Sequence, residues 1–217
     1  MPIRDRLNRP VGSRCRPRLL PGMIAPWHTH RPRSSSSAAR SPQSVTLSPG
    51  FAPGQWSAPI PCTDWTVRQL VNHLVGIIHV FAALLSDRTP PRSAADHLGD
   101  SPKDAYRDSA EALQAVFDQP GVLERTYHGP LGAATGAERL QIRLYDLLAH
   151  GWDLAQATGQ PGEPPDDLAE QALAFAQTQL SEQDRNARFA PAQFVTSDAP
   201  AIERLVAFLG RSVDTHR

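Results

Sequence analysis

The sequence predicts an all-α protein built as a bundle of four or five helices with short connections. Apolar residues recur at helical spacing in several segments that Pro- and Gly-containing turns separate. Two of these segments open with a Thr followed three residues later by Gln or Glu, a pattern typical of helix N-termini. Neither a succession of strands nor an internal repeat is visible in the sequence.

The first fifty residues differ from the rest in composition. Residues 1–50 are rich in Pro, Arg and Ser and have no helical or strand period, so we expect a disordered basic leader followed by a helical domain over 51–217. A basic arm that touches phosphate or lipid, and a misassigned start site or reading frame, are the other interpretations. Residues 1–40 hold nine Arg and one Asp, and the whole chain has 22 basic and 22 acidic residues.

The body of the chain is therefore mildly acidic, which argues against a nucleic-acid-binding domain. No run of about 18 apolar residues is evident, so no membrane span is expected. The start lacks the apolar core of a secretory signal. Cys15 and Cys62 are too few for a disulfide framework or a zinc finger. We expect a cytoplasmic protein that binds neither nucleic acid nor membrane and is a monomer or homodimer.

The first half of the domain is expected to hold two helices. Thr66 begins a capping box, which predicts a helix over 66–86 whose apolar side includes His73. His79 falls on the opposite, solvated side of this helix. After a Pro-containing loop, Ser101 as N-cap and the Pro that follows predict a second helix that ends before Pro120.

The second half begins with residues 121–134, which are irregular or form a short extended segment. Thr135 and Glu138 then form the second capping box, and Gly159 ends a helix of about six turns. A further helix is expected over 166–184. The last one, over 200–209, is expected to be capped by Asp198 and ended by Gly210.

Two of these helices carry residues that suit a metal. Asp146 and His150 lie one turn apart on the long helix, and His73 lies on the apolar side of an earlier helix that should face it. Two imidazoles and one carboxylate suit Zn²⁺ or another divalent ion with an open coordination position. The alternatives are a core His bonded to a carbonyl, and a surface ion pair between Asp146 and His150.

Asp153 follows His150 by three residues, and two interpretations of it remain open. Its carboxylate could orient the His150 ring through a hydrogen bond to the second ring nitrogen. It could equally be a solvated helix charge or the partner of Arg143 in an ion pair. No Gly-rich phosphate loop and no Ser-His-Asp arrangement can be identified in the sequence.

Two blocks of sequence resemble a known family. PCTDWTVRQLVNHLVG (61–76) and RLYDLLAHGWDLAQATGQ (143–160) are similar to the metal-binding domain of mycothiol-dependent maleylpyruvate isomerases. They are closer still to uncharacterised actinobacterial proteins that share this domain within the DinB-like superfamily. The resemblance covers about residues 51–210. It implies a DinB-like four-helix bundle, here with an additional C-terminal helix.

The resemblance also implies a site and a chemistry. His73, Asp146 and His150 match the residues that bind a divalent metal, usually zinc, although the isomerase has Glu where this chain has Asp146. A mycothiol-dependent thiol transfer or isomerisation is implied, with a small thiol and an electrophile as partners. A non-catalytic metal-binding or stress-related bundle, and a structural bundle with an incidental metal, are the alternatives.

The chain departs from the family in one respect. The first helix of the family bundle precedes the segment that contains Trp56 and Trp65, and in this chain that region does not resemble a helix. We therefore expect a bundle that lacks one wall, or one that takes it from a partner.

Overall fold

The computed structural model describes residues 51–61, 64–92, 95–129, 132–161, 164–180 and 189–213. The predicted leader and both cysteines lie outside these ranges. The elements, in chain order, are a 3₁₀ helix η2 (Pro53–Ser57), α1 (Val67–Leu85), α2 (Pro102–Phe117), β1 (Thr126–Gly129), β2 (Gly132–Thr135), α3 (Gly136–Thr158), α4 (Asp166–Gln179) and α6 (Ala201–Phe208).

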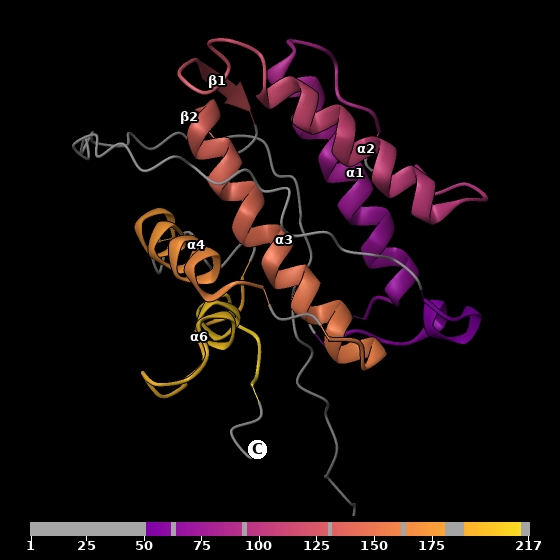
Figure 1. Ribbon diagram of the computed structural model, residues 1–217, viewed down its shortest axis with the longest axis vertical. Coiled ribbons are helices and arrows are strands. Elements are labelled where there is room, and N and C mark those ends of the chain that lie inside the picture. Colours follow the sequence, from indigo (N-terminus) through magenta and orange to yellow (C-terminus); the bar gives the residue numbers. More distant parts are fainter. Residues whose placement is uncertain are drawn as a thin grey trace, which may run out of the picture.

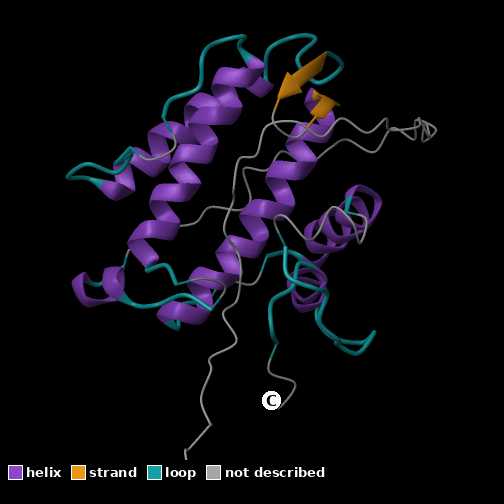
Figure 2. Cartoon of the chain, turned by 180° about the vertical axis from the view of Figure 1, so that it is seen from behind, coloured by secondary structure: helices purple, strands orange, loops and turns teal. Residues whose placement is uncertain are grey.

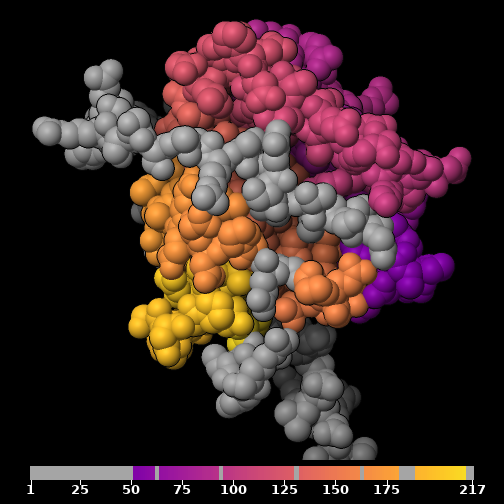
Figure 3. All heavy atoms as spheres, viewed as in Figure 1, coloured from indigo at the N-terminus to yellow at the C-terminus, as the bar shows by residue number. Residues whose placement is uncertain are grey.

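The long helix α3 runs through the middle of the fold. Helices α1 and α2 lie on one side of it and α4 and α6 on the other, as the ribbon and the space-filling view both show (Figures 1 and 3). Each side has its own apolar cluster, and α3 supplies Leu147 and Leu154 to one and Leu144 and Leu148 to the other. Because α3 is covered on two sides, it buries residues around most of its circumference.

The predicted helical fold is confirmed, whereas the regular four-helix bundle is not. In Figure 1, α1, α2 and α3 are seen along their length and α4 and α6 nearly end-on, and Figure 2 shows the same crossing from behind. In the described residues, α4 and α6 therefore cross α3 steeply and do not extend a parallel bundle.

Both predicted capping boxes are present. The Thr66 hydroxyl accepts a hydrogen bond from the Gln69 amide at 3.4 Å, and the Gln69 side chain accepts one from the Thr66 amide at 2.8 Å. Thr135 and Glu138 form the same reciprocal pair at the start of α3. Gly159 ends α3 with a left-handed φ of 66°, a conformation that glycine adopts without a Cβ clash.

The other predicted helix ends need correction. Ser101 stands at the N-cap position of α2, but its side chain makes no capping hydrogen bond. Pro200 is the N-cap of α6, so the prediction that Asp198 caps this helix is wrong. Helix α4 ends at Gln179 because Leu180 has extended backbone angles, so the predicted end near residue 184 is too late.

A hairpin precedes α3, so the extended alternative for residues 121–134 is confirmed, although the pairing of two strands there was not expected. Strands β1 and β2 pair antiparallel, with Thr126 opposite Thr135 and Gly129 opposite Gly132. The Nη2 atom of the buried Arg139 donates to the carbonyl oxygens of Tyr127, at 3.2 Å, and Gly132, at 2.6 Å. One side chain of α3 therefore ties both strands to the helix that they lead into.

Helix α1 is long and apolar enough to cross a membrane by length and composition, which the sequence analysis overlooked. Half of that window is nevertheless buried within the fold, where its side chains belong to the cluster shared with α2. The core helix of a globular domain has this composition as well.

The joint between the hairpin and α3 should not tolerate a side chain. A Cβ atom on Gly136 would lie 1.9 Å from the Val122 carbonyl oxygen. We expect Gly136→Ala to lower the free energy of unfolding by about 3 kcal/mol, since the clash is with backbone. Chemical denaturation measures this loss of stability. Gly54→Ala is the control, because no heavy atom lies within 4 Å of the position that a Cβ atom on Gly54 would take. Equal midpoints for the two variants would contradict the prediction.

Candidate metal centre

The structure brings His73, Asp146 and His150 together between α1 and α3. One potential ligand atom from each lies within 4.8 Å of the other two. The rings of His73 and His150 meet edge to face, with their centroids 5.5 Å apart. The two helices therefore present their imidazoles to one another, as the sequence pattern predicted.

The donor spacing fits one ion. Ligand atoms at about 2.1 Å from a tetrahedral ion lie roughly 3.4 Å from each other. The Nε2 atom of His150 and the Oδ1 atom of Asp146 are already 3.5 Å apart. With the His73 donor atom within 4.8 Å of both, the three form a set of two nitrogens and one oxygen, which suits Zn²⁺ and similar divalent ions.

Asp153 holds the His150 ring from the other side. The Nδ1 atom of His150 donates to the Asp153 carboxylate at 3.0 Å, so Nε2, which faces Asp146, is the ring nitrogen that can bind an ion. The Asp153 side chain is 0% exposed. The alternatives of a solvated helix charge and of an ion pair with Arg143 are therefore wrong for Asp153.

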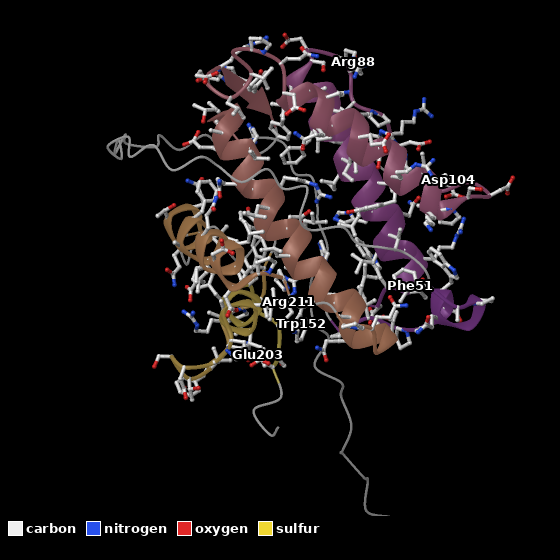
Figure 4. The ribbon with its side chains drawn as sticks, viewed as in Figure 1. Phe51, Arg88, Asp104, Trp152, Glu203 and Arg211 are labelled. Carbon is white, nitrogen blue, oxygen red and sulfur yellow. The ribbon has the colours of Figure 1, made fainter. Side chains whose placement is uncertain are left out.

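Arg211 completes this chain of contacts, and the sequence analysis missed it. It follows α6, is buried, and its Nη2 atom lies 3.0 Å from the Asp153 carboxylate. Figure 4 shows Arg211 beside Trp152, the residue next to Asp153 in α3. A buried carboxylate needs a positive partner, and a basic residue directly after the Gly210 helix stop was the available signal.

Asp146 is held by a second arginine. The Nη1 atom of Arg143, one turn earlier on α3, pairs with Oδ2 of Asp146, so that Oδ1 remains on the His150 side. Burial acts to raise the pKa of Asp146, but His150 and Arg143 together hold it well below its usual range. The carboxylate is therefore ionised and available as a ligand.

His73 is available as a neutral ligand. Burial is the main cause that lowers its pKa, to about 4, and the charge of Asp146 opposes this only in part. The Trp65 ring covers one side of the imidazole, with centroids 5.1 Å apart. His73 therefore carries no proton that an ion would have to displace at neutral pH.

His150 behaves in the opposite way. Burial acts to lower its pKa, but the Asp146 charge and the hydrogen bonds to Asp146 and Asp153 outweigh burial and raise it. In the metal-free protein His150 therefore keeps its proton at pH values where His73 has lost its own.

This difference predicts the proton balance of metal binding. At pH 6, Zn²⁺ should release about one proton per ion, because it displaces the proton of His150. The apparent affinity should rise by up to about tenfold per pH unit until pH passes the raised pKa of His150, and then level off. Calorimetry in buffers of different ionisation enthalpy measures the released protons. Binding at pH 6 without proton release would contradict this assignment.

In the part of the chain that the structure describes, a small cavity adjoins the centre. A cavity of about 50 Å³ lies beside His73, lined by residues of α1 and by Pro91 and His97. A wider depression of about 690 Å³ lies at the far end of α1, around Arg88 and Arg125, and none of the three candidate ligands lines it. The cavity beside His73 is therefore the one of these two that adjoins the candidate centre.

Fold and site together define a helical protein with a His/Asp/His candidate metal centre between two helices. Residues 43–155 match the family described as mycothiol maleylpyruvate isomerase N-terminal domain, and the chain belongs to this family. The matched region contains the three candidate ligands and Asp153. Helices α4 and α6 and Arg211 lie outside it.

The relatives carry no assigned activity. The chain is 32% identical over 161 residues to the uncharacterized proteins MT0763 and Rv0738 of two Mycobacterium tuberculosis strains, CDC 1551 / Oshkosh and ATCC 25618 / H37Rv. The aligned region covers 73% of this chain and 86% of each relative. No solved structure matches the chain.

Proposed function

We propose that this protein binds one divalent metal ion, Zn²⁺ best matching the donors, and uses it with a low-molecular-weight thiol such as mycothiol. The observation that carries the proposal is the cluster of His73, Asp146 and His150 within 4.8 Å, in a chain of the mycothiol maleylpyruvate isomerase family. Such an ion, when bound, acts as a Lewis acid toward a thiol or a carbonyl oxygen.

The residues of the chain would divide the work. His73 offers a neutral nitrogen, since burial keeps the proton off it. Arg143 fixes one oxygen of Asp146 and leaves the other for the ion, and Asp153 fixes the tautomer of His150. The helix packing leaves 12% of the His150 side chain and 26% of the Asp146 side chain exposed, and this partial burial strengthens their electrostatic contacts. The reaction class is thiol transfer, or isomerisation assisted by thiol addition, in the cytoplasm.

A conjugation assay tests this function. Zinc-loaded protein, purified without a histidine tag, should accelerate the reaction of mycothiol with an electrophilic acceptor. Chelator-treated protein and a His150→Ala variant should not, and added zinc should restore only the wild type. Equal rates for all three samples would overturn the proposal.

A non-catalytic metal-binding or stress-related role is the second candidate. The small cavity beside His73 favours it, because about 50 Å³ leaves little room for a substrate. Stoichiometric metal binding without acceleration of any thiol reaction would select this role.

A further inference from the structure

The depression of about 690 Å³ at the end of α1, which we call the distal depression, lies away from the metal centre. It is lined by the end of α1, the end of α2 with the turns that follow it, and the start of β1. Pockets of about 300–1,000 Å³ hold small organic ligands. Leu85 and His73 are twelve residues apart in α1, which is roughly 18 Å along a helix axis. Figure 4 likewise shows Arg88 well apart from Trp152, so a ligand here would not touch the metal centre.

The distal depression carries more positive than negative charge. Arg88 and Arg125 are the basic residues that line it, and Asp87 is the acidic one. Asp87 is paired with Arg125, whereas the Arg88 guanidinium has no partner within the described part of the chain. Two guanidiniums and one carboxylate leave one positive charge in excess. A monoanion would balance this charge, and a dianion would leave negative charge in excess.

The carbonyl ends of α1 and α2 also lie at this depression and carry partial negative charge. The amides of Asp87 and Arg88 donate to carbonyl oxygens of the last turn of α1, so those carbonyls are already satisfied. An exposed helix end contributes less than a direct hydrogen bond between a guanidinium and an anion. The helix ends therefore disfavour a dianion further, but they do not outweigh a contact with Arg88.

Tyr127 supplies the observation that points to a ligand. Its side chain is buried, and its hydroxyl has no hydrogen-bond partner among the residues that the structure describes. Tyr127 lines the distal depression, and the Arg125 guanidinium lies over its ring, 4.8 Å from the centroid. A buried Tyr hydroxyl usually has a partner, because an unmade hydrogen bond costs stability. A polar atom of a ligand would supply the missing partner.

The remaining wall of the depression is largely apolar. Leu85, Val116 and Val122 line it and belong, with Tyr127, to the apolar cluster between α1 and α2. Covering such a surface with an apolar group is favourable. The lining therefore offers one unpaired guanidinium, one unpaired hydroxyl and an apolar floor.

We propose that the distal depression binds a small monocarboxylate with an apolar body, separately from any ligand of the metal centre. The carboxylate oxygens accept hydrogen bonds from the Arg88 guanidinium, whose two-pronged geometry matches them. The Tyr127 hydroxyl is a second donor, since the two oxygens of a carboxylate together accept more than two hydrogen bonds. The apolar body covers Leu85 and Val116.

Benzoate is the probe, and benzamide is its neutral counterpart of nearly the same shape. Wild type should bind benzoate and not benzamide in calorimetric titrations, with the same affinity in zinc-loaded and chelator-treated protein. Arg88 is exposed, so Arg88→Met should fold, and it should weaken benzoate binding about tenfold or more through the loss of a charged hydrogen bond. The control Arg68→Met removes the same charge from a surface pair with Asp96 and should leave benzoate binding unchanged.

Tyr127→Phe distinguishes a ligand-binding hydroxyl from a structural one. Because the hydroxyl has no partner within the described residues, its removal should not lower the denaturation midpoint, but it should weaken benzoate binding severalfold. Unchanged benzoate affinity in Arg88→Met or in Tyr127→Phe would overturn the inference. Equal binding of benzoate and benzamide, or no saturable binding of benzoate by wild type, would also overturn it. Loss of benzoate binding after chelator treatment would do the same, because it would place the ligand at the metal.

Discussion

Replacing His73 or His150 by Ala should abolish stoichiometric metal binding. Wild-type protein should hold close to one divalent ion per chain, because three donors from two helices already lie within 4.8 Å of one another. Two remaining donors cannot complete a tetrahedral set. Removing a residue that hydrogen-bonds to a metal ligand typically lowers metal affinity about 10–100-fold. Removing a ligand itself should lower the affinity by more than this. Elemental analysis of untagged protein measures it.

His79→Ala is the matched control for this experiment. His79 lies on the same helix as His73, is half-buried, and its ring lies near that of His97 instead, with centroids 5.6 Å apart. It should keep its full metal content. Full retention of metal in both His73→Ala and His150→Ala would show that the cluster is a packing feature.

Local signals in the sequence predicted most of the helices, because the physics of a helix end is local. The capping boxes at Thr66 and Thr135 involve residues three apart, and the structure forms both. The pairing of Asp146 with His150 is equally local, since one helical turn separates them. The position of His73 on the apolar side of its helix, together with the family resemblance, predicted which helix faces the pair.

What the sequence could not predict depends on contacts between distant segments. Arg211 and Asp153 are 58 residues apart, so no local spacing connects them. The same contact explains why Asp153 is buried and not solvated. The hairpin before α3 was also missed as a paired element, because Gly and Ala dominate β2 and give no alternating pattern.

The steep crossing of α4 and α6 over α3 is likewise a property of packing. Their apolar stripes were visible in the sequence, but a stripe gives the side of a helix that is buried and not the angle at which it crosses its neighbour. Small residues at the contact, such as Ala169, Ala172 and Ala176 of α4, are all 0% exposed. They belong to the apolar cluster that α3, α4 and α6 share, and side chains of this size allow helices to approach closely.

Asp153→Asn should produce the second large effect, this time on stability. The change keeps the shape of the side chain but removes the charge that pairs with Arg211 at 3.0 Å. It takes the Asp153 charge away from the buried Arg211 guanidinium and weakens the hydrogen bond that His150 donates. The free energy of unfolding should fall by about 3–5 kcal/mol, the usual cost of removing one partner of a buried ion pair. Chemical denaturation with chelator present separates this from any loss of metal.

Two further variants show whether losing the ion pair between Asp153 and Arg211 causes the loss of stability. Asp96→Asn breaks the exposed pair with Arg68 and should change stability far less, because water screens both groups. Arg211→Met combined with Asp153→Asn should recover part of the loss, since the buried guanidinium that lost its Asp153 partner is then gone too. If Asp153→Asn unfolds at the same denaturant concentration as Asp96→Asn, the ion pair between Arg211 and Asp153 does not stabilise the fold as predicted. If the coupling is found, the segment after α6 stabilises His150 through Asp153, so Arg211→Met alone should also weaken metal binding.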